Sequence, residues 1–324
     1  MAMKISELRF NSYGRFLQET FGTRVHKVSV HAGFTCPNRD GTAATGGCTY
    51  CNIDSFTPRA ARARVPVKDQ VQQAIGYLKK RFKAHAFIVY FQPYSNTYAP
   101  IEHLEKLYAE ALDHPGIVGL AVGTRPDCID GAKLDLFEQI RRDYFVTLEY
   151  GIESVNDETL RIINRAHDYA CTVNAIQQTS ERGLHVAGHI ILGFPNESTD
   201  QMLATADEVS KLPLNFLKIH NLHIVRYTEL AKAYLQNPFH IFSFQEWVEF
   251  VCHFLERLNP DIVIERLYGG APLDLLITPN WRKSAAQIIY AIQKELEHRN
   301  THQGRLYGRS QKEDRQKTHA VVDL

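Results

Sequence analysis

Residues 25–52 have the sequence VHKVSVHAGFTCPNRDGTAATGGCTYCN, in which a short segment leads into a loop rich in glycine and cysteine. The first seven residues predict a β-strand. Cys36, Cys48 and Cys51 follow in the loop with the spacing C-x11-C-x2-C. Three thiolates in one loop can bind three irons of a cubane cluster and leave the fourth iron open. The glycines allow the backbone to wrap closely around such a body.

Other interpretations of the cysteines remain open on spacing alone. A structural zinc ion requires four ligands, and only Cys48 and Cys51 form a close pair, with His31 as a conceivable fourth ligand. Buried or redox-active thiols are a third possibility. Three further cysteines are dispersed singly and are expected to be small buried hydrophobic residues: Cys128, Cys171 and Cys252.

Outside this loop, short apolar segments alternate with longer amphipathic ones, which is typical of βαβ units and a parallel sheet. Six strands followed by helical segments are expected, at residues 25–31, 86–91, 117–122, 145–150, 184–192 and 216–222. The eight repeats of a closed barrel are not found. The sequence therefore predicts an α/β fold, a partial (β/α)6 TIM-type barrel with a C-terminal α/β cap.

Four parts of the chain are expected. They are an N-terminal extension (residues 1–24), the partial barrel (25–235), the cap (236–300) and a polar, mobile tail (301–324). The cap is indicated by two helical segments, near 244–258 and 281–298, and by a short strand near 262–266. The tail has almost no apolar periodicity.

Charge and hydropathy limit the partners. The 37 Lys and Arg residues nearly balance 36 Asp and Glu residues, so any nucleic-acid surface has to be a local patch. Basic side chains gather near residues 59–68, at 79–83 and at 299–317, where they form either a phosphate-binding surface or an ordinary solvated face. Without an apolar N-terminal segment or a stretch of about 18 apolar residues, we expect a cytoplasmic protein with no membrane partner.

The cysteine loop resembles that of radical S-adenosylmethionine (SAM) enzymes, in which an aromatic residue, here Tyr50, precedes the last cysteine. The long first gap is similar to that of the Elongator-related subgroup. Five further motifs resemble that subgroup in the same order: GTRPD (123–127), LEYGIES (148–154), NRAHD (164–168), GHIILGFPNES (188–198) and LKIHNLHIVRYTEL (217–230). The resemblance spans residues 25–235 and is greatest to stand-alone bacterial proteins of the YhcC and YtqA type.

The resemblance implies two cofactors, a [4Fe–4S] cluster held by the three clustered cysteines and SAM. It implies that Arg165 pairs with the SAM carboxylate and that Glu153, where relatives have Gln, accepts from the ribose hydroxyls. The turn from Gln92 to Asn96 matches the position that receives the methionine amino group. Tyr50, Ile191, Gly193 and Pro195 are expected near SAM as well. No catalytic residue is singled out.

The strand ends supply polar candidates for the substrate side of the site: Glu149, Arg125, His220 and Arg226. A buried, paired polar group is an equally ordinary role for each of them. The resemblance to Elongator favours tRNA as the substrate, at the C5 substituent of a wobble uridine. Since no acetyltransferase domain is recognised, we expect conversion of carboxymethylaminomethyluridine to aminomethyluridine, with electrons from a donor such as a flavodoxin or ferredoxin. The alternatives are a radical SAM enzyme that acts on a small metabolite and a non-enzymatic iron–sulfur or zinc protein.

Overall fold

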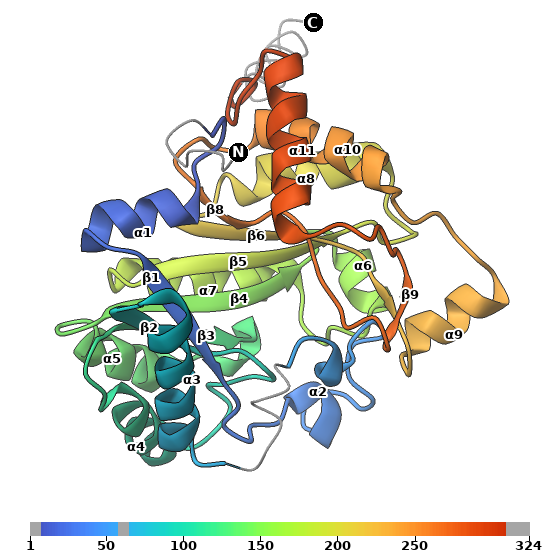
Figure 1. The fold of residues 1–324 in the computed structure, drawn as a ribbon. Helices are drawn as coiled ribbons and strands as arrows, with labels where there is room; N and C mark the ends of the chain where they lie inside the picture. The colour runs from blue at the N-terminus through green and yellow to red at the C-terminus, as the bar shows by residue number, and fades with distance from the viewer. Residues whose placement is uncertain (1–7, 58–64, 309–324) are drawn as a thin grey trace, which may run out of the picture.

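The computed structural model describes residues 8–57 and 65–308 (Figure 1). Its centre is one parallel sheet in the order β1-β2-β3-β4-β5-β6-β8. The strands are β1 (Val25–Val30), β2 (Ala86–Phe91), β3 (Ile117–Thr124), β4 (Phe145–Glu153), β5 (His185–Leu192), β6 (Phe216–Asn221) and β8 (Val263–Arg266). Each is adjacent to the next in chain order, so the connecting helices all lie on one side and the sheet curls into a half-barrel.

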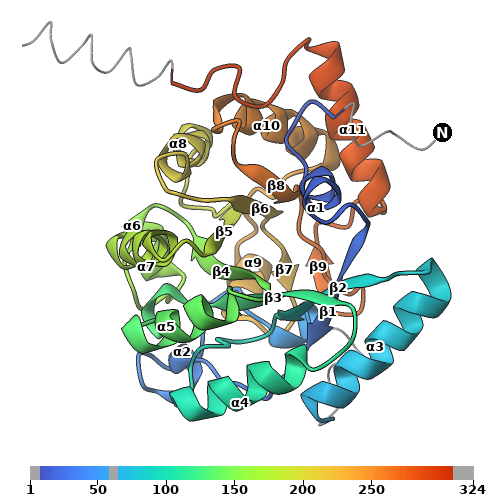
Figure 2. The ribbon, with the colours of Figure 1, turned by 90° about the vertical axis from the view of Figure 1, so that its left-hand side faces the viewer.

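Helices cover the outer face of the half-barrel (Figure 2). They are α3 (Val67–Phe82), α4 (Ile101–Leu112), α5 (Gly131–Ile140), α6 (Asp157–Ile162), α7 (Tyr169–Glu181), α8 (Thr199–Val209), α10 (Phe244–Arg257) and α11 (Ala285–His298). Ser198, Ser243 and Ser284 begin three of these helices with complete capping boxes. The central strands are buried on both faces, and all six residues of β2 are buried.

Helix α1 (Tyr13–Phe21) closes the amino-terminal end of the half-barrel. The rings of Tyr13 and Phe16 each lie 5.0 Å from the ring of Phe216, inside the curl of the sheet. The residue before α1, Ser12, forms a β-bridge with Ile264 of β8. The helix thus spans the space between the two edge strands, where a closed barrel would continue its sheet.

The partial barrel is confirmed, but the sheet has seven strands rather than six. The strand near 262–266 was expected to belong to the cap, whereas β8 pairs with β6 and continues the sheet. Val263 and Ile264 are both buried, because one contributes to the interior of the curl and the other to the layer under the helices. Two apolar residues are too short a pattern to predict from the sequence that this strand pairs with β6.

The first residues of the segment that we expected to be a mobile tail are packed against the core. Thr301 is fully buried and donates to Glu256. The buried amide of Gln303 donates to the carbonyl oxygens of Asn259 and Ile262. Thr301 is thus satisfied by a carboxylate of α10 and Gln303 by backbone carbonyl oxygens of the neighbouring loop, contacts that apolar periodicity cannot show. Residues 309–324 lie outside the described part of the chain.

A small antiparallel sheet lies beside the carboxyl ends of the main strands. It consists of β7 (Ile224–Val225) and β9 (Leu276–Thr278), and α9 (Glu229–Gln236) follows β7. Within residues 8–57 and 65–308, no helix is long and apolar enough to cross a membrane.

Candidate active site

The carboxyl ends of the parallel strands open into a cavity of about 270 Å³. Segments far apart in the chain line it, including the loop after β1, the ends of β2 to β6 and residues 266–271. Ligands of α/β folds bind at this edge because loops from several strands converge there. All three clustered cysteines line the cavity, which makes it the candidate active site.

The cysteine loop owes its shape to a short helix and to glycines. Cys36 immediately precedes α2 (Pro37–Asp40), which is a single turn. From this turn, the Nη2 of Arg39 donates to the carbonyl oxygen of Cys51 at 2.9 Å and lies 3.5 Å from its Sγ. Gly47 has a φ of 80°, and a Cβ at this position would meet the Arg39 guanidinium at 3.1 Å. A side chain at position 47 would therefore disturb the contact between the helix and the last cysteine.

The three thiols suit a cluster better than a single ion. Among residues 8–57 and 65–308, no three His, Cys, Asp or Glu side chains are arranged around one metal-ion position. The cysteines of a cubane bind different irons, so they surround a volume instead of converging on a point. Burial raises the pKa of Cys51 to about 11, and the neighbouring Cys48 adds to the effect. Iron would therefore have to displace the thiol proton.

Arg165 reaches the cavity from the turn after α6 and is almost fully buried. Its Nη1 lies 3.7 Å from the Sγ of Cys48, and its Nη2 donates to the carbonyl oxygen of Gly151 at 2.5 Å. The carboxylate of Glu153 lies 3.6 Å from the same Nη2. Burial works against the charge of Arg165, but Glu153 and Cys48 hold its pKa above the ordinary value.

Gly151 makes this approach possible, because a Cβ there would come within 2.7 Å of the Arg165 guanidinium and 2.3 Å of the Glu153 carboxylate. The backbone of Glu153 is itself left-handed, with a φ of 66°. Such a conformation is rare for a residue with a side chain and clusters at functional sites. The end of β4 is therefore shaped to bring Glu153 and Arg165 together beside the cysteines.

Two buried guanidinium nitrogens at the cavity have no hydrogen-bond partner in the described part of the chain, the Nε of Arg165 and the Nη1 of Arg125. Leaving such a donor unsatisfied costs about 1–3 kcal/mol. An anionic ligand can satisfy both nitrogens. The carboxylate of SAM is a ligand of this kind, so the residues present fit the expected cofactor.

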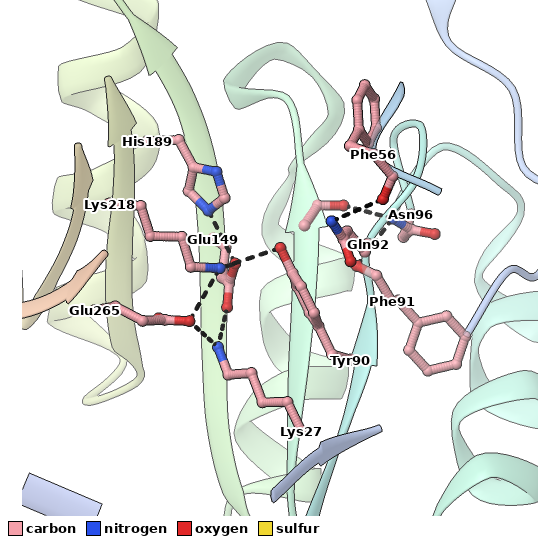
Figure 3. Close-up of polar contacts among 11 residues, drawn as sticks. Lys27, Phe56, Tyr90, Phe91, Gln92, Asn96, Glu149, His189, Lys218 and Glu265 are labelled. Carbon is pink, nitrogen blue, oxygen red and sulfur yellow. Dashed lines mark hydrogen bonds and ion pairs between the residues drawn. The ribbon is translucent and has the colours of Figure 1, made fainter. Parts of the chain in front are cut away.

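The other predicted SAM residues divide into two groups. Tyr50, Gln92 and Ile191 line the cavity. Asn96, Gly193 and Pro195 do not line it. Asn96 is fully buried, and its amide donates to the carbonyl oxygens of Phe91 and Gly123, so it ties β2 to β3 (Figure 3). Asn96 was predicted only from its position after β2. Such a position does not show whether a side chain contacts a ligand or donates to the backbone of neighbouring strands.

A network of buried ionic side chains forms the floor of the cavity (Figure 3). Glu149 of β4 accepts from Lys27 of β1 at 2.8 Å, from His189 of β5 at 2.9 Å and from Lys218 of β6. Glu265 of β8 binds Lys27 at 2.5 Å and Lys218 at 3.1 Å. Two lysines thus face two glutamates, and the network is balanced in charge.

The pKa values of the network follow from its burial and its pairing. Burial alone would raise the pKa of Glu149, but Lys218 and Lys27 outweigh it and hold the value well below the usual range. Burial lowers the pKa of Lys218 despite the two carboxylates. Burial and Lys218 lower the pKa of His189. At neutral pH we therefore expect a charged glutamate and a neutral imidazole.

Part of the cavity lining was predicted from the sequence. Glu149, Arg125 and His220 line the cavity as expected, whereas Arg226 is exposed and lies outside the lining. The lining residues that were missed include four polar ones with a part in the charge arrangement of the site: Tyr90, His189, Lys218 and Arg266. The first three sit inside apolar strands, where a lone polar residue facing the interior of the curl was the available signal.

A half-barrel of parallel strands with three cysteines and paired arginines at its carboxyl edge defines a candidate metal–sulfur enzyme. The chain belongs to the radical SAM superfamily, whose profile matches residues 38–209, and residues 214–298 match the radical SAM C-terminal domain. Members of this superfamily use a [4Fe–4S] cluster and SAM, and this chain is accordingly a radical SAM enzyme.

The chain is similar in sequence to three known proteins and in fold to one solved structure. The chain is 34% identical over 308 residues to the uncharacterized protein YtqA of Bacillus subtilis, covering 95% of this chain and 96% of that protein. It is 36% identical over 272 residues to protein YhcC of Escherichia coli, covering 84% and 87%. A tRNA uridine(34) acetyltransferase of Methanocaldococcus infernus is 21% identical over 176 residues, covering 53% and 32%. The structure of Elp3 from the same archaeon superposes with a TM-score of 0.67 at 17% identity, covering 86% and 64%.

Proposed function

We propose that Cys36, Cys48 and Cys51 hold the cluster and that SAM lies across the cavity between them and β6. The support is geometric, because all three cysteines line the same cavity as Arg165 and Glu153. In this proposal, Arg165 pairs with the carboxylate of SAM, and Glu153 accepts from its ribose hydroxyls. Tyr50, Gln92 and Ile191 complete the walls around the cofactor. When bound, the cluster and SAM supply a 5′-deoxyadenosyl radical that removes a hydrogen atom from an unreactive C–H bond.

The proposed substrate is tRNA, at the C5 substituent of a wobble uridine. The observation that carries this proposal is the similarity of the radical SAM part to an enzyme named for its action on tRNA uridine(34). The match covers 32% of that enzyme, so the acetyl transfer in its name is not carried over. We propose that this chain instead remodels a substituent already present and converts carboxymethylaminomethyluridine to aminomethyluridine. Such an enzyme works where tRNA is, in the cytoplasm.

The proposed conversion is a two-electron oxidation of the substrate in which SAM would be the oxidant, released as methionine and 5′-deoxyadenosine, so no other oxidant is needed. A hydrogen atom leaves the methylene between the amine nitrogen and the carboxylate, and one electron then leaves the same carbon. The resulting iminium reacts with one water molecule, which breaks the N–C bond and gives the primary amine and glyoxylate. The electron released equals the one consumed when SAM is cleaved. A donor such as a flavodoxin or ferredoxin is needed to prime the cluster.

One of the basic stretches predicted to bind tRNA, residues 79–83, lies at the far end of a helix from the carboxyl ends of the strands. Lys79, Lys80 and Arg81 are exposed in the last turn of α3, and Lys83 follows the helix. The helix has 16 residues, so this turn lies about 24 Å from the first residue of α3, the end that contacts His31 after β1 through Gln70. The basic residues within 58–64 and 309–324 lie outside the described part of the chain.

Nearer the cavity, Tyr227 is 85% exposed and has a left-handed φ of 65°. It follows Arg226, whose carbonyl oxygen accepts from Asn52, and Asn52 lines the cavity. An exposed aromatic ring beside a guanidinium suits stacking on a nucleic-acid base and contact with a phosphate. We therefore propose that these two residues contact the anticodon loop.

The experiment is anaerobic turnover of reconstituted protein with tRNA that carries carboxymethylaminomethyluridine. Digestion and mass spectrometry of the nucleosides should show aminomethyluridine, and a diamine should trap one equivalent of glyoxylate. A Cys48→Ala variant is the matched inactive control. Reductive cleavage of SAM with an unchanged nucleoside profile and no glyoxylate would contradict the tRNA proposal while leaving the enzyme class intact.

A further inference from the structure

A bulge places two successive side chains of β8 at the cavity. Leu217 of β6 pairs with Ile264, but the next residue, Lys218, pairs with Arg266, so Glu265 is the extra residue between them. In a regular strand, two successive side chains would point to opposite faces of the sheet. Here Glu265 binds the lysines of the floor, while Arg266 lines the cavity. The bulge thus directs a second charged side chain toward the site.

Arg266 differs from the other cations of the cavity in having no partner. Four cationic side chains of the lining are engaged within the protein: Arg39 by Cys51, Arg125 by Asp127, Arg165 by Glu153 and Lys218 by Glu149. Arg266 forms no hydrogen bond or ion pair within residues 8–57 and 65–308, and its side chain is exposed. A guanidinium without a partner at the wall of a cavity is free to bind an anion.

His220 of β6 provides a second donor on the same wall. Its ring stacks on that of His189, with centroids 5.6 Å apart. Burial holds the pKa of His220 well below its ordinary value, and the neighbouring His189 and the charge of Arg266 act in the same direction. The ring is therefore neutral and can donate one hydrogen bond. The floor lysines face their own carboxylates, so the positive potential at this end comes from Arg266.

The cavity therefore has two separate cationic ends. One end holds Arg165 and Arg125 and lies beside the cysteines, where we place the carboxylate of SAM. The other end holds Arg266 on β8, which lies three strands along the sheet from β4, whose Gly151 carbonyl oxygen accepts from Arg165. A single SAM molecule has one carboxylate, so the second end is left for the substrate.

We infer that Arg266, with His220 beside it, binds a carboxylate of the substrate and makes the enzyme selective for an acidic substituent. This inference rests on the proposed function, in which the acidic group is the carboxymethyl group of the modified uridine. The planar guanidinium can donate two parallel hydrogen bonds to that carboxylate, which holds the adjacent methylene in a fixed position. Arg266 is thus a specificity-determining residue.

The first arm of the test compares two synthetic anticodon stem-loops on the cluster-loaded protein with SAM. Their wobble uridine carries either the carboxymethylaminomethyl group or its neutral carboxamide. We expect the wild-type protein to bind the acid about 10- to 100-fold more tightly than the amide, as for a charge-assisted pair. Arg266→Gln should abolish this preference, and Arg266→Lys should retain part of it. Preference retained in Arg266→Gln would overturn the inference.

Arg226→Gln is the matched control, since it removes the same charge from an exposed residue outside the lining. It should weaken both stem-loops equally and keep the preference for the acid. Loss of the preference in Arg226→Gln as well would show general electrostatics and overturn the inference. Circular dichroism should show Arg266→Gln to be folded, because Arg266 makes no side-chain bond within the described residues.

The second arm separates this inference from the proposed function. N-methylglycine carries the same amine and carboxylate as the substituent but no nucleoside. Saturation-transfer NMR should detect it on wild-type protein and on Arg226→Gln, and not on Arg266→Gln. If it binds in this pattern while the stem-loops are neither bound nor converted, the carboxylate site stands and the tRNA proposal fails. If it binds equally to Arg266→Gln, or not to the wild type, the carboxylate site is refuted.

Discussion

The floor network offers a measurable test of how charge balance stabilises the half-barrel. Side-chain exposure is 0% for Glu149, 3% for Lys218, 9% for Glu265 and 18% for Lys27. Replacing Glu149 by Gln keeps the shape but leaves two buried cations facing one carboxylate. Breaking a buried pair in this way costs about 3–5 kcal/mol. We expect the variant to lose that amount of unfolding free energy at pH 7.

The corresponding fall in melting temperature follows from the size of the protein. A chain of 324 residues has an unfolding entropy of about 0.7 kcal/mol per kelvin, so the loss corresponds to about 4–7 °C. Metal-free protein should be used, with unfolding followed by circular dichroism, so that iron release does not contribute. Glu158→Gln is the control, because Glu158 is an exposed partner of Arg161 and such pairs contribute only about 0–1 kcal/mol.

The dependence on pH gives a second check. The pKa of Glu149 is depressed in the folded protein, so its stabilisation is present above its unfolded value and is lost as the pH falls through its folded value. The difference between wild type and Glu149→Gln should therefore shrink in acid. Burial already lowers the pKa of Lys218, and losing Glu149 lowers it further. The unfolded variant then binds more protons, so its stability should rise from neutral pH toward the pKa of a free lysine.

Charge balance can be restored in a double variant. Glu149→Gln with Lys218→Met leaves Lys27 and Glu265 paired at 2.5 Å. We expect the double variant to be more stable than Glu149→Gln alone, a coupling that a double-mutant cycle measures directly. A loss below about 1 kcal/mol in the single variant, or a double variant weaker than the single one, would refute the reasoning.

Three further outcomes are expected. Cys36→Ala, Cys48→Ala and Cys51→Ala should each abolish SAM cleavage and lower the iron content, whereas Ala at Cys128, Cys171 or Cys252 should leave about four irons per chain by colorimetric analysis. Arg165→Ala should weaken SAM binding by about 2–4 kcal/mol by calorimetry, with partial recovery in Arg165→Lys; unchanged affinity in a folded Arg165→Ala protein would contradict the assignment. Tyr227→Ala should weaken tRNA binding by about 1–3 kcal/mol. Arg226→Gln should reduce the slope of log binding constant against log salt concentration by about one unit. Replacing Lys79, Lys80, Arg81 and Lys83 by Gln should leave this slope nearly unchanged.

The fold was largely predictable because its strands are short apolar runs between amphipathic helices. The expected and observed limits of β2 agree, at 86–91, since all its residues are buried and its flanks are polar. Helix α1 was missed as a structural part of the barrel. Its contacts with Phe216 and with β8 depend on residues about 200 and about 250 positions away, and no local pattern carries that information.

The site residues that belong to a sequence motif were predictable, whereas those that reach the site through strand register or a bulge were not. The cysteine loop and the pair Glu153 and Arg165 were expected, and they lie together at one cavity. Lys218 and His189 were missed because the inward face of a strand depends on its register in the sheet. Arg266 depends on a bulge that only the pairing of β6 with β8 reveals.

The two edge strands of the half-barrel, β1 and β8, are held together by other contacts than neighbouring strands within the sheet. Within the sheet, neighbours such as β1 and β2 are paired along six residues of backbone. Between β1 and β8, the connection is the ion pair of Lys27 with Glu265 and the packing of α1. Within the described residues, no ladder of strand pairing joins these edges, and the backbone link is the single bridge of Ser12 with Ile264 before α1. We therefore expect mechanical compliance to be greatest along this line. A change in the curvature of the sheet, and with it in the width of the cavity above the floor, would then leave every strand with its neighbour in the ladder.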